Sequence, residues 1–285
     1  RSVSMNLTSP KEIAALLKEN SLSPLKKFGQ NFLCDENVVH KIADSMNLTK
    51  EDYVLEIGTG LGTLTLALAS RAKKVVSVEI DRGLLALHAI TLSEADNITI
   101  IEGDILKTDL MEICRQEFEG KSFAVCGNLP YYITSKIILM LLECGAPIIS
   151  ITAMVQKEVA QRLCCGAGST DFGALSASCQ YYTQPQLLFL VSHHCFYPMP
   201  EVDSAIIYFD LSRPSYAVLR ENYVSVVRAA FAMRRKTIFN NLKSLADAQQ
   251  VAEILKQCEI SPKTRAQDLS SDDFCRLTQA FFPKK

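Results

Sequence analysis

The chain of 285 residues is long enough for one large domain and a smaller one. Its 30 basic and 31 acidic residues leave a net charge of −1, which excludes a uniformly basic nucleic-acid-binding protein and requires any such surface to be local. Ten scattered cysteines without a C-x-x-C pair favour free thiols in a cytoplasmic protein over disulfides or a zinc site, and no apolar run is long enough to span a membrane.

Residues 1–4 precede Met5 and are interpreted as a cloning remnant outside the fold. Helices are expected at residues 11–20 and 37–46, where apolar residues recur at helical spacing. Apolar strands and amphipathic helices then alternate. The strands are expected at residues 53–57, 75–80, 98–101, 123–126 and 148–154, and the helices at residues 63–70, 82–92 and 135–142. This alternation predicts an α/β fold with a mostly parallel sheet that helices cover on both faces.

The second half of the chain has a different pattern. Residues 186–191 and 205–209 have the character of strands without a helix between them, which predicts an antiparallel pair at the sheet edge. From residue 216 onward the apolar spacing is helical. We therefore expect one domain at residues 5–211 and a small all-α domain at residues 212–285.

A glycine-rich turn follows the first strand of the alternating region. Gly58, Gly60 and Gly62 allow the backbone to turn sharply and to approach a ligand closely. Glu79 ends the next strand, at a position where a carboxylate can accept both hydroxyls of a ribose. A dinucleotide site is the alternative, but its pyrophosphate turn usually has the spacing G-x-G-x-x-G, whereas this chain has G-x-G-x-G.

Two further polar residues follow later strands. Asp104 closes the third strand of the alternating region, where a carboxylate suits the amino group of an adenine, and Asn128 follows the fourth. Because the carboxyl ends of parallel strands meet at one edge of an open α/β sheet, these residues are expected to share a site with Glu79 and the glycine turn. The combination favours S-adenosylmethionine over NAD as the cofactor.

Residues 128–131, Asn-Leu-Pro-Tyr, lie between a predicted strand and a predicted helix. The amide of Asn128 offers an uncharged acceptor, Pro130 removes a backbone donor, and Tyr131 offers a stacking face. These properties suit a flat base that carries an amino group. An ordinary strand-to-helix turn is the structural alternative for so short a motif.

Five segments are informative together: residues 28–33 (FGQNFL), 56–60 (EIGTG), 79–81 (EID), 128–131 (NLPY) and 196–204 (FYPMPEVDS). With these motifs the chain resembles the ribosomal RNA adenine dimethyltransferases, and most closely the bacterial enzymes that act on 16S rRNA of the small subunit. The resemblance includes residues 154–160 and 234–242 and covers nearly the whole chain. It implies a Rossmann-like methyltransferase domain that uses S-adenosylmethionine, followed by a small helical domain that binds rRNA.

The resemblance also implies roles for individual residues. The implied cofactor contacts are Asn31, Leu33, Gly58, Gly60, Glu79, Asp104 and Asn128, without a metal. The implied catalytic residues are Asn128, Leu129, Pro130, Tyr131 and Phe196. Asn128 and a backbone carbonyl of Leu129 or Pro130 would accept hydrogen bonds from the adenosine amine. Tyr131 and Phe196 would hold the base, although for Phe196 the residues alone favour a core aromatic. Tyr132 stands where many relatives carry asparagine.

The second domain supplies the local basic surface that the whole chain lacks. Residues 213–243 contain seven basic residues and one acidic residue, hence a net charge of +6. The residues expected to bind rRNA phosphates are Arg228, Arg234, Arg235 and Lys236. Lys26 and Lys27 fit a solvated turn and a phosphate contact equally well. The pair His193-His194 lacks a third metal ligand at a suitable spacing, which favours a structural role.

Three other functions compete with the one that the resemblance implies. A large-subunit rRNA adenine methyltransferase of the macrolide-resistance kind shares the N-terminal motifs but tends to be more basic. An assembly factor that only binds RNA would not need an intact residue 128–131 motif and glycine turn, although binding and catalysis can coexist. A small-molecule methyltransferase would leave the basic helical domain without a purpose. What the resemblance implies is a monomeric enzyme that dimethylates N6 of two adjacent adenosines in a loop near the 3′ end of 16S rRNA within the 30S subunit, with a role in ribosome biogenesis.

Overall fold

The computed structural model describes residues 6–25, 29–212 and 218–283. The predicted cloning remnant at residues 1–4 lies outside the described part, as do Met5, Lys26, Lys27, Phe28 and Arg213. In the part that is described, no helix is both long enough and apolar enough to cross a membrane.

The chain forms two compact units. The first, which we call the sheet unit, contains the chain up to Lys157 together with Leu187–Phe209. The second, the helical unit, contains Glu158–Gln186 and the chain from Asp210 onward. The helical unit is therefore built from two separate segments of the chain.

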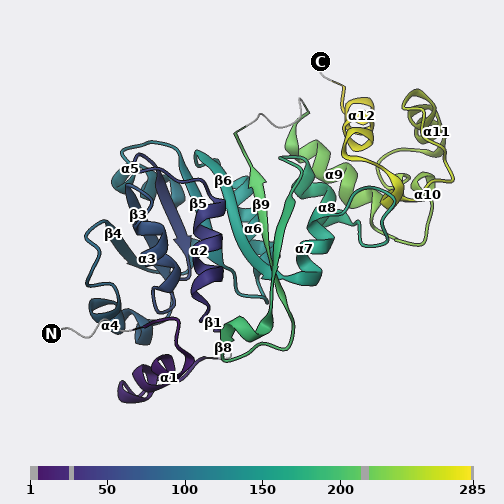
Figure 1. Cartoon of the computed structure of the whole chain (residues 1–285). Coiled ribbons are helices and arrows are strands. Elements are labelled where there is room, and N and C mark those ends of the chain that lie inside the picture. The colour runs from purple at the N-terminus through teal and green to yellow at the C-terminus, as the bar shows by residue number, and fades with distance from the viewer. Residues whose placement is uncertain (1–5, 26–28, 213–217, 284–285) are drawn as a thin grey trace. The chain divides into compact units, whose positions relative to one another are not determined.

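A seven-stranded sheet forms the centre of the sheet unit (Figure 1). Its strands lie in the order β4, β3, β2, β5, β6, β9 and β7. Their bounds are β2 Tyr53–Ile57, β3 Lys74–Glu79, β4 Ile98–Glu102, β5 Phe123–Asn128, β6 Ile148–Gln156, β7 Gln186–Val191 and β9 Ser204–Asp210. The pairs of β2 with β3 and β5, of β3 with β4, and of β5 with β6 are parallel, which confirms the predicted α/β fold.

The strand order determines where a ligand can bind. Strands β3 and β4 lie on one side of β2, whereas β5 and β6 lie on the other, so the order reverses between β2 and β5. At such a reversal the connecting helices leave to opposite faces, and a crevice opens at the carboxyl ends of the strands. The strands β7 and β9 lie side by side at one edge of the sheet, as predicted.

The sheet unit contains the three helices predicted between the alternating strands, which are α3, α4 and α6. The bounds are α1 Pro10–Glu19, α2 Glu36–Ser45, α3 Thr63–Ala69, α4 Arg82–Thr91, α5 Leu110–Glu117 and α6 Thr134–Glu143. Helices α2 and α3 bury Ile42 and Leu68 in one hydrophobic core with Val54 and Val75 of the sheet. This packing covers the strands that carry the glycine turn and Glu79.

A two-stranded ribbon lies outside the main sheet and was not predicted. Strand β1 (Phe32–Leu33) pairs antiparallel with β8 (Phe196–Tyr197). Phe32 is opposite Tyr197 and Leu33 is opposite Phe196. The ribbon therefore joins two of the motif segments that are far apart in the sequence.

The helical unit has its own hydrophobic core. Its helices are α7 Lys157–Cys164, α8 Ala174–Gln180, α9 Arg220–Ala230, α10 Ile238–Leu242, α11 Ala248–Gln257 and α12 Ser271–Phe281. The buried residues Phe172, Ala177 and Tyr181 pack in one cluster with Tyr223 and Phe274. The Tyr223 hydroxyl also donates to the Ala177 carbonyl at 3.0 Å. This packing corrects the predicted division at residue 212, because residues 158–186 bury their apolar side chains with the C-terminal helices.

Candidate active site

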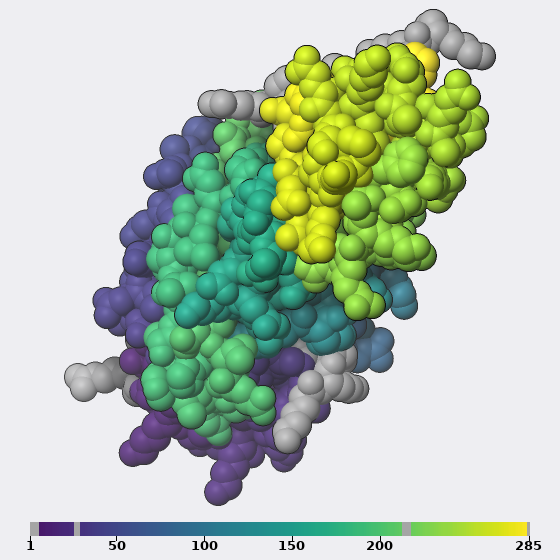
Figure 2. Space-filling view, turned by 90° about the vertical axis from the view of Figure 1, so that its right-hand side faces the viewer, coloured from purple at the N-terminus to yellow at the C-terminus, as the bar shows by residue number. Residues whose placement is uncertain are grey.

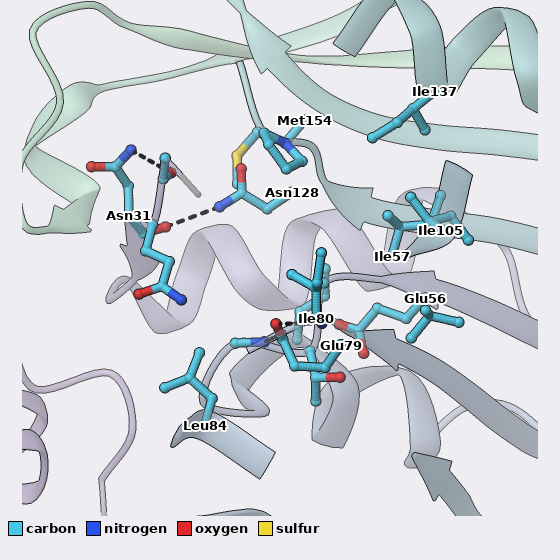
Figure 3. A pocket seen from close by; sticks show the side chains of 18 of the residues that line it. Asn31, Glu56, Ile57, Glu79, Ile80, Leu84, Ile105, Asn128, Ile137 and Met154 are labelled. Atoms are coloured by element: carbon cyan, nitrogen blue, oxygen red, sulfur yellow. Dashed lines mark hydrogen bonds between the residues drawn. The ribbon is translucent and has the colours of Figure 1, made fainter. Parts of the chain in front are cut away.

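A cavity of about 320 Å³ opens at the carboxyl ends of the parallel strands (Figure 3). This volume is in the range of small-molecule sites. Its lining includes every residue predicted to contact the cofactor, namely Asn31, Leu33, Gly58, Gly60, Glu79, Asp104 and Asn128. The fold thus brings together residues of β1, the glycine turn after β2 and the ends of β3, β4 and β5.

The glycine turn after β2 has a backbone that other residues rarely adopt. Gly60 has φ +57° and Gly62 has φ +92°, both in the left-handed region. A Cβ atom on Gly62 would also lie 2.3 Å from Cδ2 of Leu92, so a side chain there would clash with its neighbour. Gly58 and Gly60, which line the cavity, leave the backbone of this wall without side chains and open to a ligand.

Glu79 connects the glycine turn to the end of β3. Its Oε2 accepts from the Gly60 N–H, and its Oε1 accepts from the N–H groups of Ile80 and Asp81, each at 2.9 Å. A carboxylate has about four acceptor positions, so Oε2 keeps one for a ligand hydroxyl. The side chain is only 5% exposed, and this burial raises its pKa. Glu79 is thus a carboxylate that is held rigidly at the cavity wall.

His88 supports the same turn from the inner face of α4 and was missed by the sequence analysis. Its Nε2 lies 2.9 Å from the Gly60 carbonyl oxygen, and burial lowers its pKa, so the neutral ring donates through Nε2. Nδ1 is buried without a hydrogen-bond partner among the described residues. The sequence did contain a signal for the burial of His88, because the residue lies at helical spacing from the apolar residues Leu84 and Leu87 on one face of the helix.

Asp104 lies at the end of the third strand of the cavity wall, as predicted. Its Oδ1 accepts from the Leu106 N–H at 3.0 Å and caps a short helical turn, Ile105–Lys107. Its Oδ2 lies 3.9 Å from Nζ of Lys107, and the carboxylate is 30% exposed. This oxygen remains able to accept a hydrogen bond from an amino group in the cavity.

The orientation of the Asn128 amide is set by a hydrogen bond from the other side of the cavity. Nδ2 of Asn128 donates to the carbonyl of Asn31 at 3.0 Å (Figure 3). Because a carbonyl oxygen can only accept, the atom of the Asn128 amide that faces it must be Nδ2 and not Oδ1. Oδ1 then has no hydrogen-bond partner among the described residues. The preceding Gly127 is needed because a Cβ there would lie 2.6 Å from the Ile57 carbonyl oxygen.

The backbone after Asn128 distinguishes between the two carbonyls that the sequence left open. The Pro130 carbonyl accepts from the Ile133 N–H at 3.2 Å and from the Thr134 hydroxyl at 2.9 Å. The N–H of Leu129 donates to Met154, but no described group donates to the Leu129 carbonyl. A carbonyl has two lone pairs, so the Pro130 oxygen is fully used, whereas the Leu129 oxygen keeps both of its lone pairs among the described residues. Leu129 itself is buried between two residues of the cavity lining, Asn128 and Pro130, and is not part of that lining.

The aromatic residues predicted to hold a base do not line the cavity. The Tyr131 hydroxyl lies 2.8 Å from the Ser204 hydroxyl, and burial raises the pKa of Tyr131. Phe196 is 4% exposed and packs in the core with Leu33. In this conformation Phe196 therefore occupies the core position that the residues alone favoured. Tyr132, which stands where many relatives carry asparagine and was assigned no role from the sequence, does line the cavity.

Glu56 is a buried carboxyl group beneath the glycine turn. It is 1% exposed, and its Oε2 accepts from the hydroxyls of Thr65 at 2.6 Å and Ser77 at 2.7 Å. Burial raises the pKa of Glu56 to about 8, although the two hydrogen bonds favour the charged form and lower the pKa in part. The group is therefore protonated and neutral near pH 7.

The buried carboxyl leads to a testable prediction about stability and pH. Between about pH 4.5, the usual pKa, and about pH 8, folded Glu56 holds a proton that the unfolded chain has lost, so the free energy of unfolding decreases as the pH rises. Glu56→Gln keeps an uncharged hydrogen-bond acceptor, and it removes the pH dependence of stability that Glu56 causes. Thermal unfolding should show that the wild type loses on the order of 1 kcal/mol more per pH unit in this window than the variant. Equal pH slopes for the two proteins would contradict the assignment.

The predicted rRNA contacts lie in the helical unit. Arg228, Arg235 and Lys236 are exposed, and no carboxylate within the described ranges forms an ion pair with them. Arg234 donates through Nη2 to the Thr170 carbonyl at 2.6 Å, so it is held in place by its own unit. Figure 2 shows the face on which the residues after 220, in light green to yellow, are exposed.

His193 and the cysteines have structural surroundings. Nδ1 of His193 lies 2.6 Å from Oδ1 of Asp203, and this pairing lowers the pKa of Asp203. Within residues 6–25, 29–212 and 218–283, no group of three His, Cys, Asp or Glu side chains is arranged to hold a metal. All ten cysteines are free thiols.

Known proteins resemble this chain over most of its length. Residues 23–282 match the family described as ribosomal RNA adenine dimethylase. The chain is 42% identical over 278 residues to the protein of Lachnoclostridium phytofermentans named "Ribosomal RNA small subunit methyltransferase A", covering 95% of this chain and 96% of that protein. A protein of the same name from Caldanaerobacter subterraneus subsp. tengcongensis is 43% identical over 260 residues, covering 90% and 97%.

Two solved structures have a similar fold. The 23S rRNA methyltransferase ErmE is 28% identical, with a TM-score of 0.70 and coverage of 88% of this chain and 99% of that one. A dimethyladenosine transferase from Plasmodium falciparum has a TM-score of 0.74 and covers 85% and 94%, but at 24% identity it shows the shared fold alone.

Proposed function

The chain belongs to the ribosomal RNA adenine dimethylase family, and from this premise we propose that it methylates N6 of two adjacent adenosines in a loop near the 3′ end of 16S rRNA. The chain is an S-adenosylmethionine-dependent rRNA adenine dimethyltransferase, in line with the family match. The names of its relatives, which are about two-fifths identical, support the small subunit as the substrate. We further propose that the enzyme acts in the cytoplasm as a monomer on the 30S subunit during ribosome biogenesis.

The cavity fits S-adenosylmethionine by the chemistry of its donors and acceptors. The glycines that line the cavity, Gly58 and Gly60, leave room for close approach of the cofactor. The remaining acceptor position on Glu79 suits a ribose hydroxyl, and the exposed oxygen of Asp104 suits the adenine amino group. When bound, the cofactor supplies an electrophilic methyl group.

The orientation of Asn128 is the observation that carries the proposed reaction. The amine of adenosine is a poor nucleophile because its lone pair is delocalised into the ring. Oδ1 of Asn128 and the Leu129 carbonyl accept no hydrogen bond from any described group, and they can accept the two N–H bonds of that amine. As the nitrogen becomes pyramidal and gains positive charge, these fixed dipoles stabilise it more than the flat ground state.

The reaction does not require a strong base in the protein. The methylated nitrogen carries a positive charge and is acidic, so it readily loses a proton. An uncharged amide at Asn128 is therefore sufficient, and an anion that would have to be buried unpaired at this site is avoided. Holding the amine in line with the methyl group supplies much of the remaining acceleration.

A labelled methyl group tests the proposed function. The protein is incubated with S-adenosylmethionine carrying a labelled methyl group and with small subunits from cells that lack this modification, and the digested RNA is analysed by nucleoside. The expected product is N6,N6-dimethyladenosine in 16S rRNA. The similarity to ErmE makes 23S rRNA the second candidate substrate, so a parallel reaction contains purified 23S rRNA. Label in the 23S rRNA of that reaction, with none in the small subunits, would support the second candidate instead.

Arg235 provides a test of the proposed phosphate contacts. Its side chain is exposed and forms no ion pair with any described carboxylate. Arg235→Ala should weaken binding to small subunits severalfold and reduce the slope of log K against log salt by about 1. Lys256→Ala, which removes an exposed cation from α11, is the matched control and should leave that slope unchanged. An unchanged slope for Arg235→Ala would place this side chain away from phosphate.

A further inference from the structure

Three aromatic side chains that the sequence places around the methyl-acceptor segment differ in what they expose. Tyr131 is half-buried, with its hydroxyl against Ser204, and Phe196 is 4% exposed in the core. Tyr132 lines the cavity and is 59% exposed. Among the three, Tyr132 is therefore the ring with a face free for a ligand.

Tyr132 stands at the rim of the cavity. A Cβ atom on Gly29 would lie 3.9 Å from Cδ1 of Tyr132, so one side of the ring lies along bare backbone. Its hydroxyl forms no hydrogen bond with any of the described residues. An exposed tyrosine without a polar partner beside a cavity is typical of a surface that stacks on a flat ligand.

We propose that Tyr132 stacks on the base next to the adenosine that is being methylated, an inference that rests on the proposed function. The target amine must reach Oδ1 of Asn128 and the Leu129 carbonyl, and these two residues precede Tyr132 on the same segment and are less exposed than it. A neighbouring base is joined to the target by one phosphodiester, so it lies at the rim when the target is inside. Bases in a single-stranded loop are free to unstack and to stack on an aromatic side chain.

This arrangement connects Tyr132 to the substrate in which two adjacent adenosines are methylated. While either adenosine occupies the cavity, the other or its next neighbour is available to the ring. Every base has a π-face, so the contact does not depend on the identity of the stacked base. Tyr132 is thus assigned a role in holding the RNA loop and none in the chemistry of transfer.

Fluorescence gives a direct test, because the chain contains no tryptophan. Tyr132→Trp introduces a single reporter that should be quenched by an RNA hairpin with two adjacent loop adenosines. Quenching should decrease when the adenosine that stays at the rim is replaced by an abasic site. Ile90→Trp, at a 55% exposed position on α4 outside the cavity lining, is the control and should not respond. Quenching of Tyr132→Trp by S-adenosylhomocysteine alone would overturn the proposal, because the ring would then contact the cofactor.

Kinetics on small subunits provide the second measurement. Tyr132→Ala should raise KM for under-methylated small subunits by about five- to a hundredfold, with kcat and the Kd of S-adenosylhomocysteine nearly unchanged, and Tyr132→Phe should restore KM. An unchanged KM for Tyr132→Ala in an enzyme that methylates normally would refute the role of Tyr132. Absence of transfer by the wild type would instead refute the proposed function, so the two failures are distinguishable.

Discussion

Replacing Asn128 by alanine is expected to lower kcat for methyl transfer by at least about a hundredfold while S-adenosylmethionine still binds. The substitution removes Oδ1, one of two acceptors that stabilise positive charge on the amine as it forms. The Leu129 carbonyl is then the one acceptor of the pair that remains. The substitution also removes the hydrogen bond from Nδ2 to the Asn31 carbonyl. The effect falls on the transition state because the neutral amine gains less from these dipoles than the charged one.

Single-turnover transfer and calorimetric binding of S-adenosylhomocysteine, measured on the same Asn128→Ala preparation, separate catalysis from binding. Asn128→Asp is a useful companion, because a carboxylate cannot donate to Asn31 and would face its carbonyl oxygen. Asn37→Ala, at an exposed helical position on α2, is the matched control and should transfer methyl groups at the wild-type rate. A rate for Asn128→Ala close to that of the wild type would remove the amide from the mechanism.

Glu79→Gln is expected to weaken S-adenosylmethionine binding by about ten- to a hundredfold. The carboxylate accepts three backbone N–H groups, and the amide of glutamine must turn an NH₂ group toward one of them. If that N–H belongs to Gly60, the glycine turn loses its anchor to β3. A hydrogen bond to a charged group is worth about 1.5–3 kcal/mol, which sets the scale of the loss.

The pH dependence of cofactor binding should report the same group. Burial raises the pKa of Glu79, so the wild-type affinity should decline with falling pH at a higher pH than for an ordinary exposed glutamate. Glu79→Gln should show a weak affinity without this decline. Glu102→Gln is the control, because Glu102 is the register partner of Glu79 on β4 and is half-exposed. Titration of S-adenosylhomocysteine at several pH values measures all three proteins, and a wild-type affinity independent of acid pH would contradict the role of Glu79.

The sequence predicted which residues come together at one cavity wherever a strand end carries a polar residue. Glu79, Asp104 and Asn128 each follow an apolar strand, and the parallel topology then places them at one edge of the sheet. Local pattern and a general rule for α/β sheets were sufficient for these residues. The fold class and the place of the cofactor pocket followed from the same reasoning, whereas the family followed from the resemblance of the motif segments.

The parts that the sequence did not predict depend on contacts between distant segments. The ribbon of β1 and β8 consists of two-residue strands, which are too short for a periodic signal. His88 and its hydrogen bond to Gly60 depend on how α4 packs against the glycine turn. The inclusion of residues 158–186 in the helical unit depends on apolar side chains that pack across a long interval of the chain.

The sequence by itself determined which residues stand at the strand ends, because strand periodicity and motif chemistry are local properties. Only the tertiary structure decided which of their atoms are free to act. Backbone and side-chain hydrogen bonds occupy the Pro130 carbonyl and Nδ2 of Asn128, and they leave Oδ1 of Asn128 and the Leu129 carbonyl available. Packing in the same way buries the Phe196 ring and exposes that of Tyr132, since burial depends on neighbours that come from elsewhere in the chain.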